Sequence, residues 1–249
     1  MSVTTNEQPS KWPKPLPELT QEQSRINDDW QKYWFEVNRT STYTKIFDFG
    51  HNFVVRRSRP GFVRTLEIGA GLGDHLYYEK LSDEQMENYI SVEIRDNMAE
   101  EFKKRWPRAK ITMADCQEHI PYPDGHFDRV IAIHVLEHLY NLPAALREIS
   151  RLLNKKRGQL LVIIPCEGGL GYTLGRKLTT ERMFIKRYKM PYKWSIEAEH
   201  PNKADEVIFE LKKFFAIDDQ SWYPLWVSSV NLNLCIGLEL RPLKHLPPQ

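Results

Sequence analysis

The feature of this sequence that most constrains its fold is a short apolar run, residues 63–68, that continues into a turn with glycine at alternate positions. These glycines are Gly69, Gly71 and Gly73. Glycine accepts a positive φ and leaves the backbone bare, so that another group can lie directly against it. A buried strand that runs into such a turn is typical of a nucleotide-binding α/β fold. We therefore expect a ligand at this turn, with a tight structural turn as the alternative.

The composition is that of a globular protein with one sizeable core. The chain has 249 residues, of which 41% are hydrophobic and 27% charged, and a net charge of +2. So small a charge argues neither for nor against nucleic acid. The N-terminus lacks a charged start followed by an apolar block, so we expect no signal peptide. No apolar run approaches the roughly 20 residues that span a bilayer. Three distant cysteines exclude a fully paired disulfide framework and a CxxC metal knuckle, so we predict a cytoplasmic protein.

From residue 62 onward, short apolar runs alternate with amphipathic segments. Continuously apolar strands separated by amphipathic helices indicate a parallel sheet with helices on both faces. Two final strand-like runs are joined too closely for a helical crossover and should pair antiparallel. The predicted strands are 63–68, 89–93, 110–114, 128–134, 160–164, 216–223 and 232–240, and the predicted helices are 74–81, 97–106, 143–153 and 204–215.

We divide the chain into an N-terminal part, 1–61, and a main domain, 62–249. Residues 1–19 contain four prolines and predict an extended or disordered arm. Helical spacing of aromatic residues from Ile26 to Val37 predicts a helix whose aromatic face packs, most simply, on the main domain. Residues 43–53 receive no assignment. Residues 166–203 lack clear periodicity and follow the fifth strand, where open α/β sheets bind ligands, so we predict a lid insertion there.

The spacing of the glycines bears on the kind of ligand. A dinucleotide fingerprint places its third glycine three positions after the second, whereas Gly73 comes two positions after Gly71. Asp74 follows and would repel a pyrophosphate at a helix N-terminus. An adenosine that carries a cationic amino acid would tolerate this surrounding. Glu93 at the end of the second strand could accept hydrogen bonds from both ribose hydroxyls, and Asp115 could bind the adenine amine or cap the following segment.

Taken together, these segments resemble the class I S-adenosylmethionine-dependent methyltransferases. The resemblance rests on residues 66–73, 92–93, 114–116 and 127–139 and covers about residues 62–165. It implies a Rossmann-like α/β fold with seven strands, mostly parallel, the last antiparallel, and S-adenosyl-L-methionine as cofactor. It also implies a set of cofactor-binding residues. These are Glu67, Gly69, Ala70, Gly71, Gly73, Glu93, Ile94, Asp115, Cys116, His134 and Val135.

Two histidines are candidate general bases, since an imidazole titrates near neutral pH. His138 follows His134 by one helical turn if the chain becomes helical there, and packing is the alternative. His200 follows Glu199, and carboxylates beside it could orient its ring. A surface Glu-His-Pro turn is the alternative for this stretch. We predict His200, His138 and Glu199 as catalytic residues and no metal, because one histidine with nearby acids offers too few soft ligands.

The predicted lid interleaves basic and aromatic residues, among them Arg176, Arg182, Tyr188 and Trp194. This mixture suits an anionic ligand with a flat or sugar-like surface, such as a nucleotide-activated or phosphorylated glycan. It would also suit nucleic acid, an anionic membrane surface or a merely solvated helix. We predict methyl transfer to an oxygen or nitrogen of a small, anionic or sugar-like acceptor. Methylation of RNA or protein, or a non-catalytic S-adenosylmethionine-binding module, are the alternatives, and nucleic acid is disfavoured because there is no separate basic domain.

Overall fold

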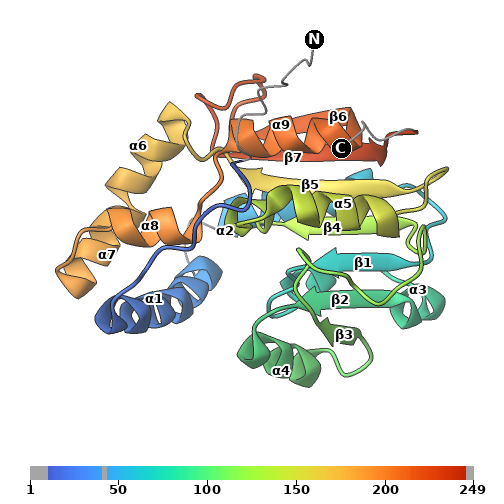
Figure 1. The fold of residues 1–249 in the computed structure, drawn as a ribbon, viewed down its shortest axis with the longest axis horizontal. Coiled ribbons are helices and arrows are strands. Elements are labelled where there is room, and N and C mark those ends of the chain that lie inside the picture. The colour runs from blue at the N-terminus through green and yellow to red at the C-terminus, as the bar shows by residue number, and fades with distance from the viewer. Residues whose placement is uncertain (1–10, 41–43, 245–249) are drawn as a thin grey trace, which may run out of the picture.

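The computed structural model describes residues 11–40 and 44–244, so the first ten residues of the predicted arm lie outside the described residues. Its centre is a seven-stranded sheet with the strand order β3-β2-β1-β4-β5-β7-β6 (Figure 1). Neighbouring strands pair parallel except at β7, which is antiparallel to both β5 and β6. The predicted Rossmann-like sheet is thereby confirmed. Its strands are β1 Thr65–Ile68, β2 Tyr89–Glu93, β3 Lys110–Met113, β4 Arg129–Ile133, β5 Gln159–Pro165, β6 Phe215–Tyr223 and β7 Cys235–Pro242.

Helices cover both faces of the sheet, as predicted. On one face α5 (Leu142–Leu152) and α9 (Ala204–Phe214) share a core with Val130 of the central strand β4. On the other face α2 (Thr44–Arg57) packs against Ile131, the next residue of the same strand. Consecutive strand residues point to opposite faces, so continuously apolar strands are what a sheet covered on both sides requires.

The segment after the glycine turn differs from its prediction. Instead of one helix over 74–81, a short 3-10 helix, Asp74–Tyr77, is followed by α3 (Asp83–Glu87). Ser82 starts this new helix with a capping box. Its hydroxyl accepts a hydrogen bond from Gln85 N at 3.2 Å, while the Gln85 side chain accepts one from Ser82 N at 2.9 Å. After β2, α4 (Asp96–Arg105) runs close to its predicted bounds.

Two stretches without a clear pattern are helical. The unassigned residues 43–53 fall in α2 from Thr44 on. The insertion holds three helices, α6 (Leu170–Leu178), α7 (Thr180–Tyr188) and α8 (Lys193–Glu199). Each has at most nine residues, or about two and a half turns. Helices this short end before an apolar repeat becomes visible in the sequence.

The N-terminal helix α1 (Gln21–Thr40) packs its aromatic face on the inserted helices, which are the lid part of the main domain 62–249. The Trp30 ring lies edge-on to Phe184 of α7, with 5.2 Å between ring centroids, and edge-on to Tyr192 at 6.2 Å. Figure 1 shows α1, α6, α7 and α8 gathered at the end of the sheet to which β1, β4 and β5 point. This helical lobe therefore stands at the edge where open α/β sheets bind ligands.

The described helices were compared with the length and apolarity that a membrane span requires. None of them is both long enough and apolar enough to cross a bilayer.

Candidate functional site

The turn after β1 gives its three glycines different surroundings. All have positive φ: 64° at Gly69, 56° at Gly71 and 77° at Gly73. A Cβ at Gly69 would come 2.5 Å from Val135 Cγ2, and one at Gly73 would come 2.6 Å from Trp106 Cδ1. A Cβ at Gly71 would meet no atom within 4 Å. The protein itself fills the space at Gly69 and Gly73, so the open room that the sequence suggested for all three is at Gly71.

Two further predicted cofactor residues, Glu67 and Ala70, lie in the interior. The buried Glu67 carboxylate accepts a hydrogen bond from the Tyr89 hydroxyl at 2.9 Å, and burial raises the pKa of Glu67. Ala70 is buried in the cluster that includes Phe102 of α4. The Glu67 side chain is thus engaged by the protein beneath the turn, and its part in cofactor binding stays a prediction.

Glu93, the predicted ribose ligand, ends β2 beside the glycine turn. Its Oε2 accepts a hydrogen bond from Gly71 N at 2.9 Å, and its Oε1 accepts bonds from Ile94 N at 2.9 Å and Arg95 N at 3.0 Å. A carboxylate has about four acceptor positions, so about one remains. Glu93 fixes the bare turn and the start of α4 together, and it can take one further donor without losing a backbone bond.

Asp115 and Cys116 follow β3 at the same edge of the sheet. Asp115 Oδ1 accepts a hydrogen bond from Gln117 N at 2.8 Å, and the Gln117 side chain donates to Asp115 as well. This fits the capping alternative, although the residues that follow form a turn instead of a helix. Cys116 is buried, which raises its pKa to about 12. Its thiol is therefore protonated and packed in the main core.

A cavity of about 530 Å³ lies between α1 and the start of α4. Its lining includes Gln31 of α1 and the segment from Ile94 to Met98. Ile94, directly after Glu93, is 59% exposed. Gln31 accepts a hydrogen bond from Arg95 Nη1 at 2.7 Å, so α1 is tied to the loop that carries the predicted ribose ligand. No motif in the sequence indicates that the N-terminal helix reaches this edge.

His134 and Val135 follow β4 and face the turn after β1. His134 has a φ of 53°, a strained value for a residue with a side chain. Its backbone N donates to Ile163 O at 2.9 Å, which ties this corner to β5. Val135 occupies the space that a Gly69 side chain would need. The predicted pair is therefore adjacent to the glycine turn, with its exposure to a ligand limited by packing.

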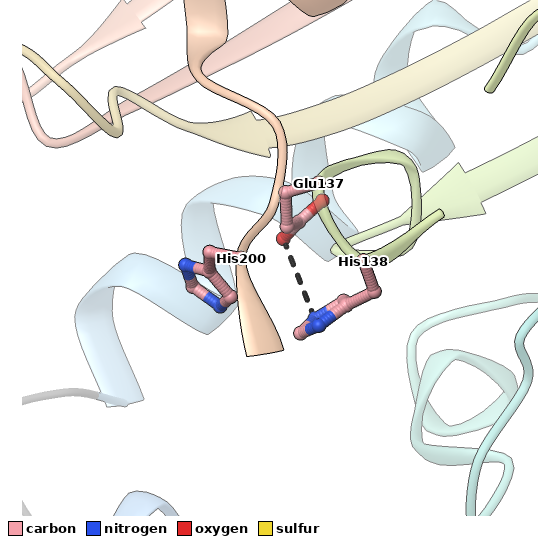
Figure 2. Close-up of side chains that lie close together, drawn as sticks. All are labelled: Glu137, His138 and His200. Atoms are coloured by element: carbon pink, nitrogen blue, oxygen red, sulfur yellow. Dashed lines mark ion pairs between the residues drawn. The ribbon is translucent and has the colours of Figure 1, made fainter. Parts of the chain in front are cut away.

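Two of the three predicted catalytic residues, His138 and His200, meet beside a buried acid, Glu137. Figure 2 shows Glu137, His138 and His200 together at the end of β4, and Glu137 Oε1 lies 3.9 Å from His138 Nε2. The rings of His138 and His200 are edge-on, with centroids 4.7 Å apart. His138 Nδ1 donates to the backbone oxygen of Glu199. The fold thus joins residues that are 62 positions apart in the chain.

Hydrogen bonds fix the proton positions in this cluster. A carbonyl only accepts, so the proton of His138 is on Nδ1 and its Nε2 presents a lone pair. His200 Nδ1 lies 3.2 Å from a carboxylate oxygen of Glu167, the residue that follows Cys166 after β5. This carboxylate orients the ring and leaves His200 Nε2 free to take a proton. The Glu199 carboxylate accepts hydrogen bonds from Asn27 and Gln31 of α1 through Oε1, and its Oε2 lies 3.9 Å from His138 Nδ1, so it anchors the segment to α1.

Burial and neighbouring charges separate the titration of these groups. Burial, and then the charge of His200, lower the pKa of His138 to about 4. Burial alone would raise the pKa of Glu137, but the hydrogen bond with His134 and the nearby histidines outweigh it and lower this pKa. At neutral pH the cluster therefore holds an ionised carboxylate and a neutral His138. Since His138 is a weak base, His200 is the better placed proton acceptor.

Glu137, His138 and His200 each offer a possible metal ligand atom, and these atoms lie within 4.8 Å of one another. The sequence argument against a metal counted one histidine, and the fold supplies a second. Two ligands about 2.0–2.1 Å from a tetrahedral zinc ion are about 3.4 Å apart, whereas Glu137 Oε1 and His138 Nε2 are 3.9 Å apart. In this arrangement the cluster suits proton transfer better than metal binding, and the absence of a metal stays a prediction.

Glu137 and Glu167 were not among the site residues predicted from the sequence. Glu137 lies between His134 and His138, three positions after the first, a spacing that brings side chains together on a helical turn. That spacing could have identified it. Glu167 follows the fifth strand, and only the fold shows that it faces His200.

Comparison with known proteins finds similarity to methyltransferases. Residues 66–162 match the family described as "Methyltransferase domain". A probable S-adenosylmethionine-dependent methyltransferase of Mycobacterium tuberculosis is 26% identical over 158 residues, which are 64% of this chain and 51% of the relative. An uncharacterized protein of Methanocaldococcus jannaschii is 34% identical over 100 residues, 40% of each chain. The chain spans about half the length of the mycobacterial relative, and less of the archaeal one.

Solved structures share the fold. The PH0226 protein from Pyrococcus horikoshii has a TM-score of 0.59 at 14% identity and covers 85% of this chain and 99% of its own. A possible histamine N-methyltransferase from Thermotoga maritima has a TM-score of 0.57 at 20% identity, with 87% and 96% covered. At such low identity these likenesses concern the fold alone.

Proposed function

We propose that this chain is a class I S-adenosylmethionine-dependent methyltransferase, which moves a methyl group from S-adenosyl-L-methionine to an oxygen or nitrogen of a small, anionic or sugar-like acceptor. The observation that carries the proposal is the open backbone at Gly71, bonded directly to Glu93. These two residues stand at the ends of adjacent parallel strands. Such a place suits a nucleoside ligand.

The residues present fit the cofactor that the family implies. Gly71 would hold the amino-acid portion, the remaining acceptor position of Glu93 would bind a ribose hydroxyl, and exposed Ile94 would pack on the adenine. The sulfonium of the bound cofactor supplies an activated methyl group. The protein's task is then alignment and exclusion of water. The helical lobe at the end of the sheet is suited to both and supports the proposed lid role of residues 166–203.

A proton must leave the acceptor when the acceptor is an alcohol. We assign this proton to His200 Nε2, because Glu167 holds the opposite ring nitrogen at 3.2 Å. His138 and Glu199 would position the segment: His138 bonds the Glu199 backbone, and the Glu199 side chain bonds α1. General-base catalysis contributes about 10²–10⁴-fold, so His200 should affect turnover far more than binding.

The acceptor class rests on the charge of the insertion. Its basic residues outnumber its acids, and Tyr172, Tyr192 and Arg176 lie together where it meets the sheet. Cations and aromatic rings suit a phosphorylated or nucleotide-linked sugar. The three free, buried cysteines support the predicted cytoplasmic localisation.

Transfer of a labelled methyl group into a cell extract tests the proposal. We expect label in the small-molecule fraction with the wild type and strongly reduced label with His200→Gln, which should still bind cofactor in calorimetry. Label in the RNA or protein fraction would replace the proposed acceptor class. Cofactor binding without transfer to any fraction would favour a non-catalytic binding module.

A further inference from the structure

Helix α6 turns one side to the protein and leaves the other side apolar and exposed. Gly171 N donates to Asn231 O at 2.8 Å, and Gly175 approaches Leu234, so this side packs on the segment between β6 and β7. Leu170, Leu174 and Leu178 are 74%, 59% and 50% exposed. Their four-residue spacing aligns them along one stripe of the helix.

The connection between β6 and β7 continues this stripe. Residues 224–234 contain no charged residue. Trp226 is 94% exposed, and Leu225, Val227 and Leu232 are exposed too. The Leu170 backbone N donates to the Asn231 side chain at 3.3 Å, so the loop and the helix form one surface. We call this set of exposed apolar side chains the apolar ridge; it consists of Leu170, Leu174, Leu178, Leu225, Trp226, Val227 and Leu232.

The exposure of these side chains is built into an ordered loop. Asn233 is completely buried and acts as the loop's internal brace. Its side chain accepts from Leu225 N at 2.8 Å and donates to Val227 O at 2.8 Å and Ser229 O at 3.0 Å. These bonds hold Trp226 outward. Exposed apolar clusters of this size mark an interaction surface more often than an accident of folding.

Positive charge borders the ridge. On α7, buried Phe184 packs against α1, whereas Arg182, Ile185 and Lys186 are exposed, as is Lys189 directly after the helix. Lys177 flanks the leucine stripe on α6. The single acid of these two helices is Glu181, which lies 4.0 Å from Arg176. Helices α6 and α7 therefore combine exposed leucines with an excess of exposed cations, which we call the cationic margin.

We propose that the apolar ridge docks this protein on the surface of an anionic lipid bilayer. Leucine and tryptophan side chains enter the interface between headgroups and acyl chains, and flanking lysine and arginine side chains bind anionic headgroups. A second copy of the chain is a poorer occupant, because two cationic margins would repel each other. The proposal does not depend on the identity of the methyl acceptor. Figure 1 shows α6 and the β6–β7 connection at the same corner of the molecule.

Vesicle co-sedimentation tests the docking surface. We expect the wild type to bind vesicles of phosphatidylcholine with phosphatidylglycerol at least tenfold more tightly than vesicles of phosphatidylcholine alone, and less tightly at high salt. The double variant Leu174→Ser/Trp226→Ser should lose at least tenfold in affinity. Phe209→Ser is the matched control, because Phe209 is an exposed aromatic residue of α9 outside the ridge. It should bind like the wild type.

Three outcomes would overturn the proposal: no binding by the wild type, equal losses in the double variant and the control, or equal binding to both kinds of vesicle. A wild type that is dimeric in solution and becomes monomeric in the double variant would instead assign the ridge to self-association. Thermal melting of each variant confirms that the fold is kept, since all three side chains are exposed. Charge reversal at Lys186 and Lys189 provides a second test, and it should abolish the preference for the anionic lipid.

Discussion

Replacing Gly71 by alanine, which adds one methyl group, should allow the effect on cofactor binding to be distinguished from the effect of backbone strain. Gly71 has a φ of 56° with no atom within 4 Å of a built Cβ. Gly61, in the turn before β1, has a φ of 80° and is equally open. Gly71→Ala and Gly61→Ala therefore form a matched pair in which the same strain is introduced inside and outside the candidate site.

The expected stability changes are small and alike. A left-handed conformation costs a residue with a side chain about 1–2 kcal/mol, and replacing glycine recovers about 0.4–1 kcal/mol by restricting the unfolded chain. Each variant should lose about 1 kcal/mol, which for a chain of this size lowers Tm by about 2–4 °C. Thermal denaturation measures both losses.

The expected effects on binding differ. A Cβ at Gly71 enters the space that we assign to S-adenosyl-L-methionine, and overpacking of this kind costs about 1–3 kcal/mol. This corresponds to roughly 5–150-fold in Kd, measured by calorimetry with the cofactor. Gly61→Ala should bind with the wild-type Kd. Wild-type affinity in Gly71→Ala, or equal losses in both variants, would refute the assignment of the open backbone to the cofactor.

Four further outcomes are expected from other contacts in the structure. Gly73→Ala should destabilise the fold more than Gly61→Ala, because its Cβ would lie 2.6 Å from Trp106 Cδ1; equal melting temperatures would contradict this. Glu167→Gln should lower kcat at least tenfold and change its pH profile, with little change in cofactor Kd, whereas an unchanged kcat would remove the orienting role. The pKa of Glu206 is lowered, since the hydrogen bonds and charges of Lys11 and Lys14 outweigh the opposing effect of burial. Its contribution to stability is therefore complete above the unfolded value of 4.5 and is lost as the pH falls through the lower folded value, so Glu206→Gln should flatten the acid side of the unfolding curve. Methyl transfer should be unchanged by EDTA, and a loss restored by zinc would establish a metal at Glu137.

The sequence predicts the sheet and the positions of its motifs because both are local. An apolar run that ends in glycine or a carboxylate predicts a strand and the position of its carboxyl end. The sheet edge with Gly71 and Glu93 could therefore be predicted before any contact was known. The sequence could not predict which of the three glycines has open space beside it. The partners of Gly69 and Gly73 are Val135 and Trp106, which lie 66 and 33 positions further along the chain.

The same limit applies to the helices and to the proton acceptor. Helical spacing shows that α1 has an aromatic face but not what this face covers, and its partner Phe184 lies more than 150 positions away. His138 and His200 were recognisable as candidates one at a time. Their contact, and the carboxylate of Glu167 behind His200, exist only once β4, β5 and the insertion are assembled.

The N-terminal helix is an integral part of the candidate site, although the chain places it far from every motif. Gln31 donates to the Glu199 carboxylate at 2.9 Å and accepts from Arg95 at 2.7 Å. One side chain therefore fixes both the end of the insertion beside His200 and the loop after Glu93. A shift of the inserted helices on binding an acceptor would pull on the same side chain that holds the cofactor edge. Removing α1 would also uncover Trp30's aromatic partners, which are Phe184 and Tyr188 of α7 and Tyr192 just before α8, so residues that precede the first strand help to hold the insertion.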